Sequence, residues 1–164
     1  MNKLVQFAFS AMMALVVMGS SSPANAKNVV ADVDQIASVL QSAGYKAEIK
    51  ESAEEKGNRY IRSSASGYNF TILMYGCDET YKNCKSVQFY TAFTSKRPPT
   101  LDQMNTYARQ NRWGRVYLDK DGDPAIEFDL DLEVGGMSEA LFLDNIAYWE
   151  SIMVGFAKFV FGKE

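Results

Sequence analysis

Acidic residues alternate along one predicted strand in the second half of the chain. They are two positions apart and so share one strand face: Glu127, Asp129, Asp131 and Glu133. Neighbours on one face lie about 7 Å apart, a separation at which two carboxylates can act as acid and base in an inverting hydrolase. Such a row, with Arg115 expected opposite Glu127, is also typical of a solvated face that orients a basic partner. Hydrolysis and partner binding are both open on this evidence.

A second acidic group lies in a predicted turn. Asp119, Asp121 and Asp123 resemble the start of a calcium-binding loop. An EF-hand needs glycine at its sixth place and glutamate at its twelfth, where this chain has Pro124 and Leu130. The Asp-Gly sequence inside the group is typical of a hairpin turn. We therefore expect a turn without a specific metal, and a weak cation between Asp119 and Asp123 stays open.

The cysteine and histidine content narrows the chemistry further. Cys77 and Cys84 are the only two cysteines and lie between two strand-like runs, and the chain has no histidine. In an oxidising compartment such a pair closes a hairpin. The absence of histidine argues against a zinc site and excludes Ser-His-Asp and Cys-His catalysis, because these use an imidazole group. We predict a Cys77–Cys84 disulfide and expect no catalytic residue, no cofactor and no metal.

Residues 1–26 have the three-part pattern of a secretory signal peptide. A basic start precedes the apolar run Leu4–Met18, and Ala24-Asn25-Ala26 supplies a small-x-small cleavage site. The alternative is a membrane anchor, but a run of about 15 apolar residues is shorter than the roughly 20 that span a bilayer. We predict a periplasmic or secreted domain at 27–164, with no membrane span after cleavage. Acidic residues outnumber basic ones, and the formal net charge of the whole chain is −3. This charge argues against a nucleic-acid partner.

Five segments before the central prolines have the pattern of a helix or a strand. Helical spacing predicts a helix from about Val29 to Ala43. Segments 45–50 and 59–64 have weaker strand patterns, whereas Tyr68–Tyr75 and Ser86–Phe93 are dense in aromatic and β-branched residues. If Cys77 faces Cys84, Ile72 lies opposite Phe89 and one face of this hairpin becomes continuously apolar.

The other face of that hairpin carries Leu73, Tyr75 and Tyr90. These side chains form either an exposed patch of the kind that marks an interface or a surface beneath a covering helix. Both alternatives are open.

The remaining chain predicts a helix, a hairpin and a long final helix. Thr100 and Gln103 have capping-box spacing for a helix at 101–111. Strands at 113–118 and 125–132 are joined by a turn with Gly122 in the left-handed conformation, which sets Val116 opposite Ile126. Ser138 caps the last helix, whose apolar stripe is Leu141, Phe142, Ile146, Trp149, Ile152, Met153, Phe156, Phe159 and Val160.

These segments predict a single α+β domain. The expected order is α-β-β-β-α-β-β-α, with an antiparallel five-stranded sheet and helices packed on it.

Several segments resemble the YbjN-like domain family of bacteria, whose members are described as sensory transduction regulators. The resemblance covers about Val29 to Phe161 and is carried by Val116–Pro124, Ile126–Leu132, Gly135–Ser138, Phe142, Trp149 and Phe156. It implies a fold like that of the type III secretion chaperones, small proteins that bind partner polypeptides on a sheet-and-helix surface. It implies no catalytic residues.

Together these observations predict an exported, non-enzymatic module that binds a polypeptide or its own copy. The alternative is a hydrolase that uses the acidic strand or an aspartate-bound cation. The candidate partner surface consists of Leu73, Tyr75, Tyr90, Glu127, Asp129 and Asp131.

Overall fold

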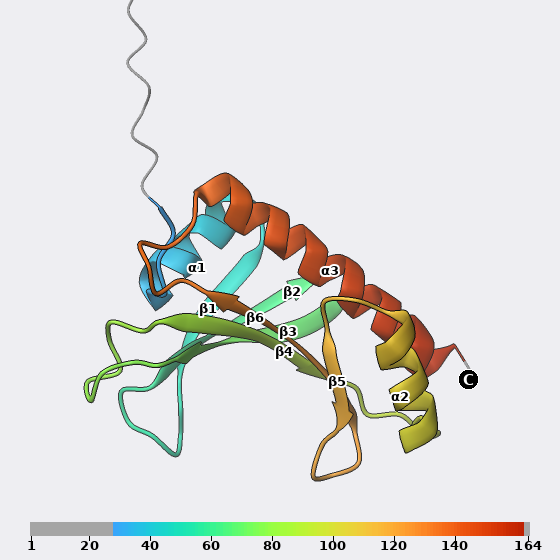
Figure 1. Cartoon of the computed structure of the whole chain (residues 1–164). Coiled ribbons are helices and arrows are strands. Elements are labelled where there is room, and N and C mark those ends of the chain that lie inside the picture. Colours follow the sequence, from blue (N-terminus) through green and yellow to red (C-terminus); the bar gives the residue numbers. More distant parts are fainter. Residues whose placement is uncertain (1–27, 163–164) are drawn as a thin grey trace, which may run out of the picture.

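The computed structural model describes residues 28–162 (Figure 1). The predicted signal peptide, residues 1–26, lies outside the described residues. The helices are α1 (Val33–Ser42), α2 (Leu101–Gln110) and α3 (Glu139–Phe161). The strands are β1 (Lys46–Glu51), β2 (Arg59–Ala65), β3 (Tyr68–Tyr75), β4 (Ser86–Ala92), β5 (Arg115–Leu118) and β6 (Pro124–Asp131).

The strands form one antiparallel sheet in the order β1-β2-β3-β4-β6-β5. The α+β class is confirmed, but the predicted count of five strands is wrong because the sheet has six. Four strands, not three, precede α2. Both weakly patterned segments form full strands, and they pair with each other over six residue pairs, Lys46–Ser64 to Glu51–Arg59.

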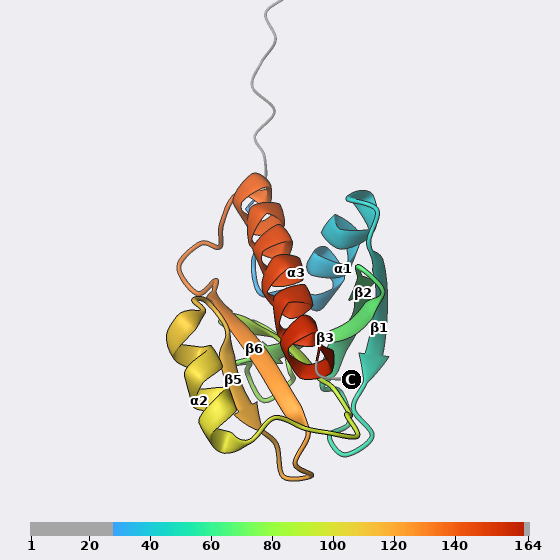
Figure 2. The same ribbon diagram turned by 90° about the vertical axis from the view of Figure 1, so that its right-hand side faces the viewer.

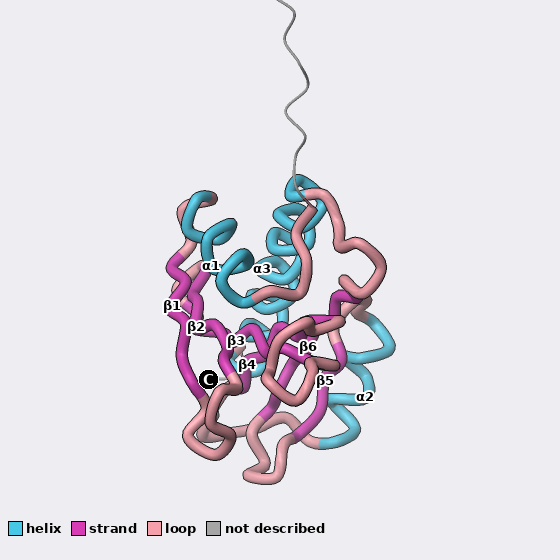
Figure 3. Tube along the Cα trace, turned by 90° about the vertical axis from the view of Figure 1, so that its left-hand side faces the viewer, coloured by secondary structure: helices cyan, strands magenta, loops and turns pink. Residues whose placement is uncertain are grey.

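Two helices cover one face of the sheet. Figure 1 shows α1 and α3 above the strands, and Figure 3 shows the same two helices together from the left-hand side. α2 lies beside the edge strand β5 (Figure 2). The core lies between the sheet and the two covering helices, where Ile72, Phe89 and Trp149 are fully buried. The ring of Trp149 contacts those of Phe70 and Phe89, with centroids 5.8 and 5.7 Å apart.

The helix starts follow from their capping residues. Thr100 and Gln103 form the predicted capping box of α2, and the Ser138 side chain accepts a hydrogen bond from the Leu141 amide in α3. α1 begins at Val33 rather than at the predicted Val29. Val29 instead exchanges backbone hydrogen bonds with Met137, so Asp32 becomes the N-cap.

Both predicted hairpin registers are confirmed. Ile72 pairs with Phe89 and Val116 with Ile126, and Gly122 has φ +84°. Two expectations about single residues are wrong. Trp113 precedes β5 instead of starting it, and Leu141, placed in the buried stripe of α3, is 50% exposed.

None of the helices within residues 28–162 is both long enough and apolar enough to cross a membrane.

Candidate binding face

Among residues 28–162, no helix lies over the face of the sheet opposite α1 and α3 (Figure 1). We call it the open face. Strand alternation places on it the side chains that do not point to the core, and the register brings all six residues of the predicted partner surface there: Leu73, Tyr75, Tyr90, Glu127, Asp129 and Asp131. Of the two alternatives for the hairpin patch, a covering helix is absent from the described part of the chain.

One cross-strand row crosses the open face from edge to edge. It takes one residue from each strand, in the order Glu48, Arg62, Thr71, Tyr90, Glu127 and Arg115. Cross-strand neighbours of this kind are within contact distance of one another. The row therefore joins a charged end at β1 and β2 to an aromatic and acidic end at β4 and β6.

Glu127 is the most enclosed charged group of the row. The residue is 7% exposed although no helix covers it. Its carboxylate accepts hydrogen bonds from Arg115 Nε at 2.8 Å, from Arg115 Nη2 and from the Tyr117 hydroxyl. Burial and the neighbouring carboxylate raise the pKa of Tyr117, and the hydrogen bond to Glu127 raises the pKa of Arg115. Both donors are thereby kept protonated and available to donate to the Glu127 carboxyl group.

Gln88 links the acidic strand to the aromatic part of the face. It is 6% exposed, its Nε2 donates to Asp129 at 2.8 Å, and the Tyr75 hydroxyl donates to its Oε1 at 3.3 Å. Burial, followed by the charges of Glu127 and Asp129, raises the pKa of Tyr75. The Asp131 side chain accepts from the Glu133 amide at the strand end.

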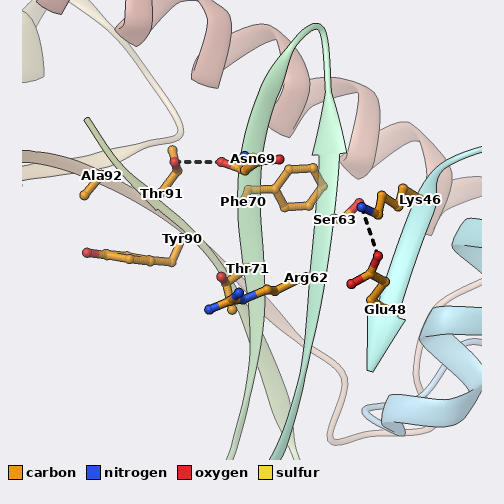
Figure 4. A pocket seen from close by; sticks show the side chains of 10 residues that line it. All are labelled: Lys46, Glu48, Arg62, Ser63, Asn69, Phe70, Thr71, Tyr90, Thr91 and Ala92. Carbon is orange, nitrogen blue, oxygen red and sulfur yellow. Dashed lines mark hydrogen bonds and ion pairs between the residues drawn. The ribbon is translucent and has the colours of Figure 1, made fainter. Parts of the chain in front are cut away.

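A pocket of 490 Å³ lies on the β1–β4 part of the open face (Figure 4). Lys46 and Glu48 form an ion pair of 2.9 Å at its β1 end, Tyr90 lines its β4 end, and Arg62 and Thr71 lie between them. Within residues 28–162, no carboxylate lies within ion-pair distance of Arg62. The pocket therefore offers an exposed guanidinium and, beyond Thr71, a tyrosine ring.

This arrangement is suited to binding more than to acid–base chemistry. An acid–base pair built from carboxyl groups needs one that can donate a proton to the substrate and one that can accept a proton at the working pH. Glu127 is instead held by an arginine and a tyrosine, and Asp129 by Gln88. The open face offers aromatic rings, aligned polar groups and charges of both signs.

The predicted disulfide joins Cys77 to Cys84 at the loop of the β3–β4 hairpin. Asp78 organises that loop, because its carboxylate accepts from the Thr80 side chain, the Lys82 amide and Asn83. These hydrogen bonds, that from the Thr80 side chain first, hold the pKa of Asp78 well below its usual range.

The Asp119 carboxylate works as a turn acceptor. It accepts from the amides of Asp121 and Asp123, both at 2.9 Å, across the tip of the β5–β6 hairpin. Among residues 28–162, no three acidic or cysteine side chains gather in a way that could hold a metal ion.

Sequence reasoning did not identify three features of the open face. Gln88 and Glu127 are buried without a covering element, and Arg62 with its pocket was not singled out. The alternation of Lys46, Glu48 and Lys50 on β1 gave a signal for the charged end, but only the pairing of β1 with β2 brings Glu48 beside Arg62.

Comparison with known proteins identifies a family. The family model YbjN, described as "putative bacterial sensory transduction regulator", matches residues 32–161. No curated protein and no solved structure matches the chain. The likeness to type III secretion chaperones therefore stays a prediction.

Proposed function

The chain belongs to the YbjN family, and from that membership we propose that it is a non-enzymatic regulatory module that binds a polypeptide through the open face of its sheet. The family description points to a regulatory or binding role. The polypeptide partner and the surface that binds it are our additions, and they rest on the arrangement of the open face.

The observation that carries the proposal is the uncovered six-stranded surface with its cross-strand row. Tyr75 is 46% exposed there, and Leu73 and Tyr90 are half-buried. Aromatic residues with a polar handle are enriched at protein interfaces, where one end meets apolar surface and the other meets water. Charges of both signs flank these side chains, which suits a partner segment with complementary charges.

We place this binding activity outside the cytoplasm. The disulfide between Cys77 and Cys84 fits an oxidising compartment. The signal-peptide pattern of residues 1–26 supports the same location. The proposed functional unit is the single domain at 27–164, in the periplasm or secreted.

The direct test is selection from a displayed peptide library against the oxidised full domain. Peptides enriched on the wild type are then titrated into ¹⁵N-labelled protein. We expect the shifted amides to lie on β3, β4 and β6. A peptide that shifts only amides of α1 or α3, or a selection that enriches nothing, would contradict the proposal. Sedimentation of the free domain shows whether a second copy is the partner instead.

A matched pair of variants separates the open face from the rest of the surface. Leu73→Ala removes an open-face side chain, and Leu141→Ala makes the same change on the exposed side of α3. We expect Leu73→Ala to weaken peptide binding by about tenfold, as for loss of a well-packed contact, and Leu141→Ala to leave it unchanged. Equal effects would place the binding surface elsewhere.

Charge removal tests the role of the acidic strand. Asp129→Asn with Asp131→Asn should slow association at low salt, and the effect should shrink as salt rises, because exposed charges act over about 8 to 10 Å at ordinary ionic strength. Asp144→Asn on α3 is the control. Hydrolytic turnover by the purified domain that disappears in Glu127→Gln alone would instead identify an enzyme.

A further inference from the structure

A second pocket, of 290 Å³, lies away from the open face. It forms where the connection from α2 to β5 passes beside the middle of α3 (Figure 1). Three aromatic side chains line it together with Ile126, Ile152 and two glycines: Tyr107, Trp113 and Tyr148. Its polar lining is Asn111, Arg112 and Ser151. Its surface is about half apolar and half polar, and its volume is at the lower end of the range of small-ligand sites.

Trp113 is held in this pocket by an unusual backbone. Its φ is +77°, a left-handed conformation that is rare for a bulky residue and costs free energy. The residue is nevertheless 56% exposed, so full burial of its side chain does not offset that cost. The ring contacts Tyr148, with centroids 5.7 Å apart. Strain that presents an exposed tryptophan to a pocket is of the kind found at ligand sites.

The glycines on either side of the pocket keep it open. A Cβ at position 114 would come within 2.7 Å of Ile126 Cδ1, so any other residue there would force the buried Ile126 side chain to move. A Cβ at Gly155 on α3 would lie 3.6 Å from the Tyr107 hydroxyl, an ordinary contact distance. A longer side chain at position 155 would therefore fill the pocket without a backbone clash.

Arg112 gives the pocket its charge. Its guanidinium lies 5.1 Å from the centroid of the Trp113 ring. No aspartate or glutamate lines the pocket, and within residues 28–162 Arg112 forms no ion pair. A guanidinium beside aromatic rings and without its own carboxylate is suited to receive one from a ligand.

We propose that this pocket binds a planar aromatic ring that carries a carboxylate on a short linker. The rings of Tyr107, Trp113 and Tyr148 receive the aromatic part, and Arg112 binds the carboxylate. Two sources supply this chemistry, a free aromatic acid and the C-terminal aromatic residue of a polypeptide. The site is separate from the open face, and neither proposal depends on the other.

The two tryptophans of the chain provide the readout. In ¹⁵N-labelled full domain, indole-3-acetate is titrated, with indole-3-acetamide as the neutral analogue. We expect the indole signal of Trp113 to shift with a millimolar or tighter Kd, while that of the buried Trp149 stays in place. The amide should bind at least about tenfold more weakly, the size expected for one charge-assisted hydrogen bond. Equal affinity for acid and amide would overturn the proposal, and so would a Trp113 shift with glucose but none with the acid.

Variants of the pocket test the same assignment. Arg112→Gln should lower affinity for indole-3-acetate about tenfold and leave the amide unchanged. Gly155→Met should abolish binding, because the methionine side chain would fill the pocket. Ala147→Met introduces a methionine at an exposed position of α3 and should retain binding. Circular dichroism of both methionine variants verifies folding. Undiminished binding by folded Gly155→Met would place the ligand elsewhere.

The two sources are distinguished by the peptide Gly-Gly-Trp with a free carboxylate. Tighter binding of this peptide than of N-acetyltryptophan identifies a polypeptide C-terminus, and tighter binding of indole-3-acetate than of both identifies a free acid. Failure of all three acids to bind overturns the inference and leaves the open-face proposal untouched.

Discussion

The two faces of the sheet bury similar groups by different means. On the helix-covered face, Phe89 and Phe128 are 0% and 7% exposed beneath α3. On the open face their strand neighbours Gln88 and Glu127 are 6% and 7% exposed with no helix over them. The covered face is stabilised by the removal of apolar area from water. The open face is stabilised by side chains that bond to and shield one another across strands.

This difference shows which face can accept a partner. Removing α3 would expose a continuous apolar core, whereas the buried polar residues of the open face, Gln88 and Glu127, are hydrogen-bonded without a covering helix. Tyr75, Tyr90 and Arg115 shield Gln88 and Glu127 while remaining in contact with solvent. A partner can therefore bind without any rearrangement of the core.

The largest expected effect comes from the covered face. Trp149→Ala should lower the free energy of unfolding by about 3 to 5 kcal/mol, because it removes a fully buried ring at the centre of the core. Tyr90→Ala on the open face should cost about 1 kcal/mol or less. Urea unfolding of both variants is the measurement, and losses of equal size would mean that the two faces are not stabilised differently.

The disulfide between Cys77 and Cys84 helps to fix the register of β3 and β4, and with it the face on which each side chain lies. A slip of one residue between β3 and β4 would exchange their side chains between the faces. The double variant Cys77→Ser, Cys84→Ser should lose about 2.5 kcal/mol in the chain-entropy model. The reduced wild type should match it in denaturant titrations. An unchanged midpoint on reduction would show that the hydrophobic pattern alone sets the register.

The buried carboxylate of the open face should have a smaller effect. Glu127→Gln should cost about 1 to 2 kcal/mol, because Arg115 and Tyr117 lose their charged acceptor. The exposed Arg115 guanidinium can regain water, which limits the loss. Asp129→Asn, with 53% of its side chain exposed, is the control and should change stability by less than about 0.5 kcal/mol. Equal losses would argue against a special role for Glu127.

The smallest expected effect is a loss of stability at alkaline pH through Tyr117, which donates a hydrogen bond to Glu127. The pKa of Tyr117 is raised in the fold from its ordinary 10.0, so the folded state favours the neutral phenol. This contribution is fully present below pH 10 and is lost as pH rises above 10 toward the folded pKa. Between pH 9 and 11 the free energy of unfolding of the wild type, measured by urea titration, should fall by up to about 1 kcal/mol more than that of Tyr117→Phe. Parallel pH profiles for the two proteins would contradict the assignment.

Local chemistry made much of the fold predictable from sequence. The cysteine pair and the Asp-Gly turn each define a short loop, so the registers of β3–β4 and β5–β6 followed from counting. Capping residues likewise gave the starts of α2 and α3.

The sequence predictions were wrong or incomplete where contacts between segments far apart in the chain determine the structure. Val29 leaves the first helix because Met137, far along the chain, offers it a strand partner. Gly136 permits that approach, since a Cβ there would lie 2.1 Å from the Val29 carbonyl oxygen. The burial of Glu127 depends on Tyr117 and Arg115 from a neighbouring strand. The pocket beside Trp113 needs α3 next to the α2–β5 connection, and the Arg-Trp-Gly sequence before a short strand was its only local signal.

The charged side chains of the edge strand β1 oppose the addition of further copies of the chain to the sheet. The opposite edge, β5, has α2 beside it, whereas β1 pairs only with β2 and leaves its other side unpaired by any described strand. A bare edge is a template on which further copies can stack into fibres. β1 carries Lys46 and Lys50 around Glu48, each in an ion pair with it. A second β1 added in the register that sets Glu48 against Glu48 would also set Lys46 against Lys50, so that like charges meet. The charged edge thus opposes growth of the sheet from one molecule to the next and leaves its open face to recruit a partner.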